Sequence, residues 1–502
     1  MRALDLAIIV VFLVGTPLLG IAIAGKQQSS SDYFVGSRKV PWWAVTFSVV
    51  ATETSTLTVI SVPTVAYLGN ITYLQLAIGY LIGRVLVAFV LLPKYYAGDL
   101  VSAYGFLGKR FGSSMQGTAS VTFLVTRLLA DGVRLFATAI PVKVMLAVFG
   151  VDAPYWIIVA AIALMAVIYT TLGGIKAVIW IDVIQMGIYV LGAVFALVIL
   201  TGKLPDGWLG AAFDAGKFQL FDFSSDVVTS HYAFITAVVG GALFAMASHG
   251  ADQLMVQRLL ACRNVKESQK AIIASGVVVF FQFALFLVVG TALWSFYKGL
   301  APADMGMEAS DELFPTFIVN ELPSGLSGLL VAGILAAAMS TISSSLNSLS
   351  TSTVSDLYQR FSKRKLADSA ILKHARVWTV VWAFVFIGFA SLFTTTEQPV
   401  VELGLSIASY TYGALLGAFF LGMLVKRARE ADAIVAFLST VVVVAVFILG
   451  VEFTVDGEQK TLAFPWYVPL GVIVSLVVGG LLSLRHPKDT PDPTQPEQAR
   501  AA

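Results

Sequence analysis

The stretch LAAAMSTISSSLNSLSTSTVSD, residues 335–356, is as long as a membrane-spanning helix, yet eleven of its twenty-two residues carry hydroxyl groups. It follows the apolar run SGLSGLLVAGI and precedes the basic tract RFSKRK, so we predict one membrane helix there. Clustered polar groups at membrane depth cost free energy and usually mark a pathway or a binding site. The stretch therefore predicts an oxygen-rich site inside a membrane protein.

The composition of the whole chain agrees with this interpretation. Of its 502 residues, 58% are hydrophobic and 12% are charged, which lies outside the range of soluble domains. Apolar segments long enough to cross a bilayer recur along the chain. We predict thirteen of them, at 5–24, 42–67, 73–97, 118–149, 154–173, 177–201, 231–250, 271–296, 325–355, 374–395, 401–425, 431–449 and 465–485.

The lysines and arginines predict the orientation. If the N-terminus is outside, most of them fall in inner loops and few in outer loops, as the positive-inside rule requires. We therefore expect an all-α, multi-pass protein of the cell (inner) membrane, with its N-terminus outside and its C-terminus inside. The net charge of +2 then reflects topology, and we expect no nucleic-acid partner.

Motifs of enzymatic chemistry are lacking from the sequence. The only cysteine is Cys262, and the four histidines show no metal-ligand spacing. There is no phosphate-binding glycine loop, nucleophile elbow or zinc-hydrolase helix. We predict that the protein is not an enzyme and that ATP does not drive it.

Two further polar clusters interrupt predicted spans. VVATETSTLTVISVP, residues 49–63, holds Glu53 among hydroxyl residues, which either bond back to their own helix or face a cavity. RLLADGVRLFATAIP, residues 127–141, holds Asp131 and Arg134. These two either neutralise each other as a buried pair or leave Arg134 to bind a substrate carboxylate.

An isolated acid and a stripe of hydroxyls suggest cation binding. Asp182, in AVIWIDVIQMG, either caps a helix, pairs with Lys176, or serves as a cation ligand or proton carrier. In the opening stretch, residues three and four apart share one face of the helix. That face presents Ala337, Ser340, Thr341, Ser344 and Ser348. Hydroxyls and carbonyls are hard oxygen ligands, which suit a monovalent cation such as sodium.

These residues resemble the sodium/solute symporter family, whose members transport sugars, proline, sialic acid, monocarboxylates, pantothenate and iodide. The resemblance covers residues 5–485 and rests on five motifs: ATETSTLTVISVPTVAY, GFLGKRFG, TLGGIKAVIWIDVIQMG, ADQLMVQRLLACRNVKES and AAAMSTISSSLNSLSTSTVSDLY. It implies the LeuT-like fold, in which two inverted repeats each begin with a broken helix.

The resemblance also implies how the chain is divided. The expected parts are an extra N-terminal helix with an inner loop (1–41), a first five-helix repeat (42–201), an outer loop (202–230), a second repeat (231–425), two C-terminal helices (426–485) and a disordered cytoplasmic tail (486–502). Binding sites of such transporters lie where the first helix of each repeat is interrupted. In the second repeat we expect the break near Gly240 and Gly241.

Ligands for sodium follow from the resemblance. The first site uses the carbonyls of Ala51, Thr54 and Ala337 with the hydroxyls of Ser340 and Thr341. Some members of the family bind a second sodium, for which the matching residues are Asp182, Ser340, Ser343 and Ser344. The resemblance thus implies one sodium ion and leaves room for two.

The resemblance also implies a solute site. Ser55 and Thr58 match positions that contact substrate in the sialic-acid members, where an arginine of the same helix as Arg134 engages the carboxylate. Glu53 matches an acid that assists cation binding in proline carriers, and Asp131 is assigned to the polar pathway. Thr58 stands where glucose carriers have a glutamine, so we expect a carboxylate-bearing solute; a sugar or proline is the alternative.

We therefore predict a sodium-coupled symporter that works by alternating access, with a small solute and the lipid bilayer as partners, and we expect a monomer. A proton-coupled symporter, with Glu53 or Asp182 titrating, is one alternative. A transporter-derived sensor is another, although the short tail after Arg485 does not suggest a signalling module. The sequence leaves open the substrate, the number of sodium ions, the oligomeric state, and whether Arg134 faces the substrate pocket or pairs with Asp131.

Overall fold

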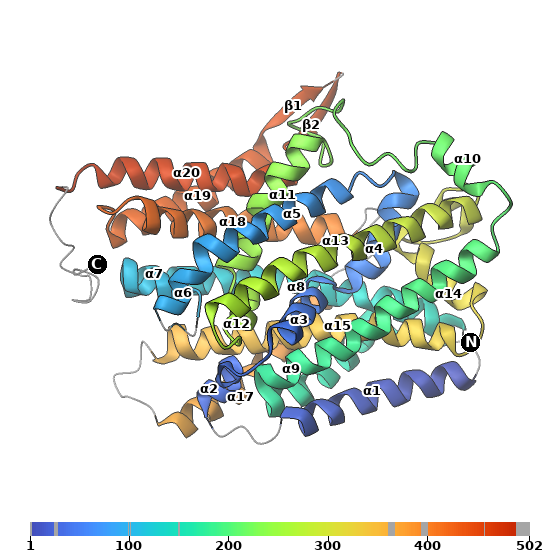
Figure 1. Cartoon of the computed structure of the whole chain (residues 1–502), viewed down its shortest axis with the longest axis horizontal. Coiled ribbons are helices and arrows are strands. Elements are labelled where there is room, and N and C mark those ends of the chain that lie inside the picture. Colours follow the sequence, from blue (N-terminus) through green and yellow to red (C-terminus); the bar gives the residue numbers. More distant parts are fainter. Residues whose placement is uncertain are drawn as a thin grey trace.

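The computed structural model of the chain describes residues 3–24, 29–98, 100, 102–148, 151–359, 367–392, 400–455 and 457–487 (Figure 1). Most of the predicted C-terminal tail, residues 488–502, lies outside this range.

Long helices packed side by side make up the molecule (Figure 1). The longer ones are α1 (Ala3–Ala24), α3 (Trp42–Glu53), α4 (Thr56–Leu68), α5 (Leu74–Leu86), α8 (Ser113–Val148), α9 (Tyr155–Gly202), α13 (Val265–Phe296), α15 (Leu326–Thr351), α17 (Asp368–Ala390), α18 (Val400–Leu424), α19 (Glu430–Gly450) and α20 (Tyr467–Ser483). Shorter ones are α2 (Ser30–Val35), α6 (Leu92–Ala97), α7 (Tyr104–Arg110), α10 (Trp208–Asp214), α11 (Gly241–Met246), α12 (Gln253–Leu259) and α14 (Leu313–Glu321).

Several helices continue as short turns of other kinds. Wider π-helical turns are η2 (Val87–Leu91), η3 (Thr236–Gly240), η4 (Ala247–Ala251) and η7 (Ser352–Tyr358). Tighter turns are η1 (Gly36–Arg38), η5 (Pro302–Met305), η6 (Ser310–Glu312) and η8 (Phe464–Trp466). π-Helical turns recur at functional sites, and η3 and η4 flank α11 next to the pocket described below.

Among the described residues, ten helices are long and apolar enough to cross a membrane, or eleven if the bent pair α3 and α4 counts as one span. The two other predicted spans are α8, which contains buried charges, and Thr236–Ala251, which is short. Thirteen crossings therefore stay a prediction. Helix α1 begins at one end of the bundle and α20 ends at the other (Figure 1), as an odd number of crossings requires. Which end faces the cytoplasm also stays a prediction.

Two predicted spans, 154–173 and 177–201, form the single element α9, which is kinked at Gly174. The backbone there has φ 57° and ψ −159°, which is not helical. A Cβ atom at this position would lie 2.9 Å from the carbonyl oxygen of Tyr33. Only glycine suits both the positive φ and the close approach, so this residue fixes the turn between the two spans.

Two helices are interrupted in the middle of the bundle. Helices α3 and α4 meet at a bend of 61°, where Thr54 and Ser55 leave the helical conformation. The second interruption lies at Asp252, which has extended backbone between η4 and α12. Its Oδ1 accepts a hydrogen bond from the Leu254 N–H at 2.8 Å and so caps α12.

The expectation of a break near Gly240 and Gly241 was wrong. Gly240 is helical, with φ −62° and ψ −45°. A Cβ atom there would lie 2.4 Å from Cβ of Pro465, and one at Gly241 would lie 2.9 Å from the carbonyl oxygen of Leu76. These glycines permit close helix packing, which is the usual role of small residues in membrane bundles.

One short sheet departs from the all-α prediction. Strands β1 (Glu452–Val455) and β2 (Glu458–Thr461) pair antiparallel, with Glu452 opposite Thr461 and Val455 opposite Glu458. They form the hairpin that joins α19 to α20 (Figure 1).

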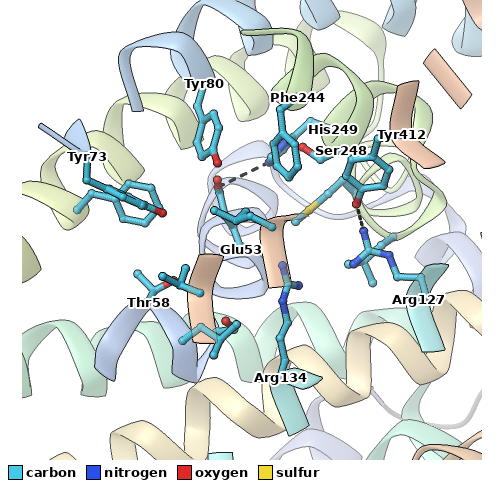
Figure 2. Close-up of a pocket in the computed structure, with 17 residues that line it drawn as sticks. Glu53, Thr58, Tyr73, Tyr80, Arg127, Arg134, Phe244, Ser248, His249 and Tyr412 are labelled. Carbon is cyan, nitrogen blue, oxygen red and sulfur yellow. Dashed lines mark hydrogen bonds and ion pairs between the residues drawn. The ribbon is translucent and has the colours of Figure 1, made fainter. Parts of the chain in front are cut away.

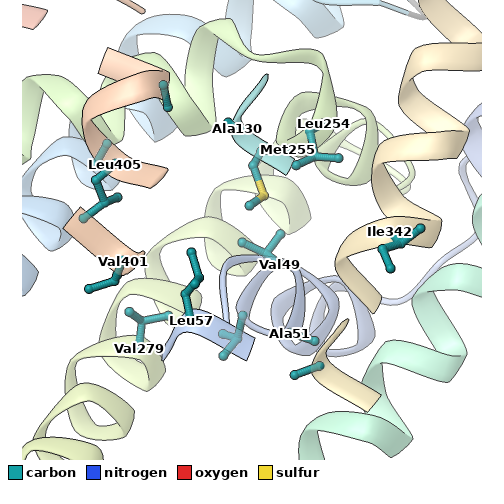
Figure 3. Close-up of a cluster of buried hydrophobic side chains, with 14 of the residues drawn as sticks. Val49, Ala51, Leu57, Ala130, Leu254, Met255, Val279, Ile342, Val401 and Leu405 are labelled. Atoms are coloured by element: carbon teal, nitrogen blue, oxygen red, sulfur yellow. The ribbon is translucent and has the colours of Figure 1, made fainter. Parts of the chain in front are cut away.

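Buried apolar side chains surround the break between α3 and α4. Ala51 of α3 and Leu57 of α4 belong to one cluster with Met255 of α12, Ile342 of α15 and Leu405 of α18 (Figure 3). Inside a membrane bundle, such side chains stabilise the fold mainly through close van der Waals packing. This packing holds the interrupted helix in one position, so its unpaired backbone groups keep a defined direction.

Candidate solute and cation sites

A pocket lies at the break between α3 and α4 (Figure 2). Its cavity volume is about 50 Å³, which is smaller than a typical small-molecule site. It is lined by Glu53, Ser55, Leu57, Thr58, Tyr73, Tyr80, Arg127, Arg134, Phe244, Ser248, His249, Leu254, Met255, Phe283, Val401, Leu405 and Tyr412. Three of the predicted residues, Ser55, Thr58 and Arg134, therefore meet in one cavity.

Glu53 reaches this pocket as half of an ion pair. Its carboxylate binds Arg84 of α5, whose side chain is fully buried. Oε2 of Glu53 also lies 3.6 Å from Nε2 of His249 (Figure 2). The hydroxyl of Tyr80 points toward Glu53 in Figure 2 and has no hydrogen-bond partner among the described residues. Because Arg84 neutralises it, Glu53 attracts a sodium ion less strongly than a lone carboxylate would.

Arg134 extends from α8 toward the middle of the pocket (Figure 2). Its Nη1 donates to Oδ1 of Asp131 at 3.1 Å. Its Nε is buried and has no partner within the described part of the chain. The structure shows the pair with Asp131, and binding of a solute carboxylate by Arg134 stays a prediction.

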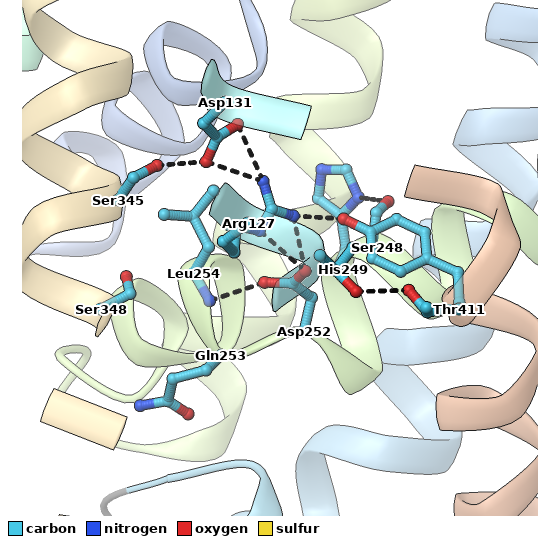
Figure 4. A network of polar contacts seen from close by, with 12 residues as sticks. Arg127, Asp131, Ser248, His249, Asp252, Gln253, Leu254, Ser345, Ser348 and Thr411 are labelled. Carbon is cyan, nitrogen blue, oxygen red and sulfur yellow. Dashed lines mark hydrogen bonds and ion pairs between the residues drawn. The ribbon is translucent and has the colours of Figure 1, made fainter. Parts of the chain in front are cut away.

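Asp131 lies behind the pocket wall in a charge network that the sequence did not reveal (Figure 4). It accepts hydrogen bonds from Ser345 of α15 and from Arg127, whose Nη1 is 3.4 Å away. Arg127 also binds the capping residue Asp252, with 2.5 Å between Nη2 and Oδ2, and donates to the hydroxyl of Tyr412. The network thus links α8, α15, α18 and the second interruption through buried, paired charges.

Ser55 and Thr58 belong to the start of α4. Ser55 has extended backbone and precedes the first residue of α4, Thr56. The positive end of the helix dipole, with its unpaired N–H groups, favours anions at this end. Arg134 lines the same cavity, so two independent features of this wall favour a negatively charged group.

The first predicted sodium site lies between α3 and α15. Thr52 Oγ1 is 3.4 Å from Ser344 Oγ, and Thr56 Oγ1 donates to the Ile334 carbonyl at 3.4 Å. These contacts lie on either side of the proposed ligands, so they bring Ala51 and Thr54 alongside the segment 337–341. Ser55 and Thr341 also line one narrow gap.

The backbone at the end of α3 suits a cation. The Ser55 N–H donates to the Glu53 carbonyl at 2.9 Å, so it does not pair with Ala51 as a continuing helix would require. Carbonyls at a helix C-terminus lack intrahelical partners and lie at the negative end of the dipole. Across the gap, Thr341 Oγ1 lies 3.1 Å from the Ala337 carbonyl, to which it donates. The residues therefore fit a sodium ion held by carbonyls and hydroxyls.

Asp182 does not pair with Lys176; its partner is Arg258 of α12, with 3.5 Å between Nη2 and Oδ2. Both side chains are fully buried. Asp182 also accepts hydrogen bonds from Ser48 and Ser340, each at 2.6 Å. The remaining residues assigned to a second sodium lie close by: Ser343 donates to the Ser340 carbonyl, and Ser344 accepts from Arg258.

Several of these residues were not predicted from the sequence. Arg84 is a charge inside an apolar span, so the rule that singled out Glu53 would also have found it. Arg258 lies in a motif already recognised, but it was counted as a loop charge that sets topology. Tyr80 and His249 could not be recognised as site residues, because a lone aromatic residue or histidine in an apolar helix is common.

The loop between α9 and η3 is attached to the end of α4. Lys217 Nζ donates to the carbonyls of Tyr67 and Gly69, each at 2.7 Å. Its ammonium lies over the Trp294 ring, 5.1 Å from the centroid. Burial lowers the pKa of Lys217. A basic side chain thus caps the C-terminal end of the broken helix.

A bundle of apolar helices, two of them interrupted around a polar central pocket, defines a membrane transport protein that binds a small solute. The family model for the sodium:solute symporter family matches residues 33–439. The chain belongs to this family, which confirms the prediction of a transporter and not an enzyme.

Relatives in this family are sodium-coupled. The chain is 31% identical to the sodium/sialic acid symporter SiaT of Proteus mirabilis, over 88% of each chain. It is 30% identical to the human sodium-coupled monocarboxylate transporter 1, over 87% of this chain and 71% of that protein. A solved outward-open, substrate-bound structure of a Na⁺-coupled sialic acid symporter, described with a novel Na⁺ site, superposes with a TM-score of 0.83 at 28% identity, over 97% of this chain and 98% of that one.

Proposed function

We propose that this protein is a sodium-coupled symporter of a small solute that bears a carboxylate group. The observation that most directly supports this is the wall formed by Arg134 and the start of α4. A guanidinium can bind a carboxylate through two parallel hydrogen bonds, and Arg134 lines this pocket. The sialic acid and monocarboxylate substrates named for the relatives also carry this group.

The opposite wall is suited to the rest of such a solute. The unpartnered hydroxyl of Tyr80 and the ring of His249 offer hydrogen bonds, while Phe244 and Phe283 offer apolar surface. Cavities of this kind, mostly apolar with a few polar groups, fix a ligand's orientation. A hydroxylated or amide-bearing carboxylic acid fits this distribution better than a simple sugar.

Sodium coupling rests on the first sodium site. A cation between Ala51, Thr54, Ala337, Ser340 and Thr341 connects the broken helix of the first repeat to α15 of the second. It thereby stabilises the arrangement in which Ser55 and Thr58 are ready to bind solute. Sodium raises solute affinity by its own preference for this arrangement, and the solute raises sodium affinity by the same factor. Rocking of the two repeats around the loaded site gives alternating access.

The division into two repeats at 42–201 and 231–425, the additional helices on either side, and a monomeric state are part of this proposal. So is the location in the cell membrane with the N-terminus outside. A second sodium at Asp182 is treated separately below.

Uptake into proteoliposomes tests the proposal. Sialic acid, lactate, pantothenate, proline and glucose would each be offered under an inward sodium gradient, under a matched potassium gradient and under an inward proton gradient without sodium. We expect accumulation of one of the three carboxylates named first, and only with sodium. Accumulation driven by protons alone would replace this proposal with the proton-coupled alternative, and accumulation of glucose alone would refute the role given to Arg134.

A further inference from the structure

We propose that the guanidinium of Arg258 is a built-in competitor for the second cation position at Asp182, so that a sodium ion binds there only by displacing it. The inference rests on the proposed sodium coupling and assigns a regulatory role to one side chain of the second cation cluster, which comprises Asp182, Ser340, Ser343, Ser344 and Arg258.

Asp182 already has a complete set of partners. Its Oδ1 accepts from Ser340 and its Oδ2 from Ser48, each at 2.6 Å. The same Oδ2 lies 3.5 Å from Nη2 of Arg258. A buried carboxylate is tolerated when it is paired and hydrogen-bonded in this way.

Arg258 is held by the same oxygens that a sodium ion would need. Its Nη2 donates to Ser344, its Nε donates to Ser48 at 3.0 Å, and its Nη1 donates to the Leu254 carbonyl at 2.9 Å. Hard cations are bound by carboxylate, hydroxyl and carbonyl oxygens. The guanidinium and a sodium ion would therefore share the ligands Asp182 and Ser344.

The two cations exclude each other electrostatically. Both Asp182 and Arg258 are fully buried, so little solvent would screen the repulsion between a bound sodium and the guanidinium. The single carboxylate of Asp182 balances one positive charge and not two. Sodium can thus occupy the cluster only if Arg258 moves away.

Displacement of Arg258 would change the solute pocket. Arg258 lies on α12, Asp182 on α9 and Ser344 on α15, so their pairing holds three helices together. Leu254 and Met255, one turn earlier on α12, line the solute pocket. Release of Arg258 by sodium frees α12 to move relative to α9 and α15, which gives the second cation a direct physical route to the solute.

Titration of purified protein with radiolabelled sodium tests this. We expect Arg258→Met to tighten the sodium affinity that depends on Asp182 by about tenfold or more, because a like charge is removed. The double variant Asp182→Asn with Arg258→Met should lose that component and keep the first sodium. Arg258→Lys retains the charge but loses the planar fork, so it should tighten this sodium affinity much less than Arg258→Met does. An unchanged or weaker sodium affinity in Arg258→Met would overturn the proposal, since Arg258 would then support the site.

A second measurement on the unmodified protein does not depend on the folding of a variant. Hydrogen–deuterium exchange of residues 253–259 should increase when sodium is added without solute, while exchange at residues 335–345 decreases. Protection of residues 253–259 by sodium would contradict displacement of Arg258. Failure of the proposed function would look different, because sodium would then change neither the exchange pattern nor the binding of any solute.

Discussion

Arg134 is the residue on which the nature of the solute depends. It occupies α8 at the pocket wall, pairs with Asp131 at 3.1 Å, and has 16% of its side chain exposed. Since Asp131 also binds Arg127 and Ser345, its single negative charge only partly neutralises Arg134. The guanidinium is therefore positioned by a buried carboxylate and keeps donors for a second one.

Replacing Arg134 distinguishes binding of the solute carboxylate from mere pairing with Asp131. We expect Arg134→Gln to weaken binding of the carboxylate solute about tenfold or more, because charge-assisted hydrogen bonds contribute about 1.5–3 kcal/mol. Arg134→Lys should weaken it less, since it keeps the charge and loses the planar fork. Solute binding measured by calorimetry at saturating sodium reports both values. Equal solute affinity in the parent and in Arg134→Gln would mean that Arg134 serves only Asp131.

At the scale of elements, the first helix supports the oxygen-rich helix α15. Asp5 of α1 accepts hydrogen bonds from the N–H groups of Gly325 and Gly328, at 2.7 and 2.9 Å. It also accepts from Ser327 Oγ at 2.9 Å. A carboxylate at a helix N-terminus satisfies free donors and interacts favourably with the dipole. Helix α1 therefore contributes the cap that α15 lacks in its own sequence.

Asp5→Ala should consequently destabilise the folded protein by about 1–2 kcal/mol, the usual contribution of an N-cap. The affinity of the first sodium should stay as it is, because Ser340 and Thr341 lie several turns away. The thermal midpoint in detergent and a sodium titration measure the two effects. Asp304→Ala, which removes an exposed acid of η5, is the control and should change neither. A large loss of sodium affinity in Asp5→Ala would show that the cap positions the cation ligands.

The elements also show how far a sequence predicts such a protein. The apolar spans and the hydroxyl-rich helix could be placed because hydrophobic length and polar clustering are local properties. The ion pairs between distant residues could not be predicted, since Glu53 and Arg84 are separated by 31 residues and Asp182 and Arg258 by 76. The break at Asp252 was missed because glycine suggested a break where it instead allows close packing.

At the scale of the whole molecule, the buried charges around the two sites balance. Four arginines pair with four acids. Arg84 pairs with Glu53 and Arg258 with Asp182, while Arg127 pairs with Asp131 and Asp252, and Arg134 shares Asp131. A solute carboxylate that enters this neutral interior adds an uncompensated negative charge, which is costly away from solvent. A sodium ion restores the balance, and this is a physical reason for the two to bind together.

In the proposed mechanism, sodium and a carboxylate solute bind the folded protein together through the hydroxyls of α15. Its most direct test is the thermal midpoint of the purified protein with each of the five candidate solutes, in sodium and in potassium. Ligands that bind the folded state raise this midpoint by mass action. The parent should be stabilised by one carboxylate in sodium alone. The variant Ser348→Ala should behave in the same way, because the Ser348 hydroxyl bonds, among the described residues, only to the Ser344 carbonyl of its own helix. The double variant Ser340→Ala with Thr341→Ala should lose that sodium-dependent shift. Equal shifts in sodium and potassium, or an unchanged shift in the double variant, would contradict the account.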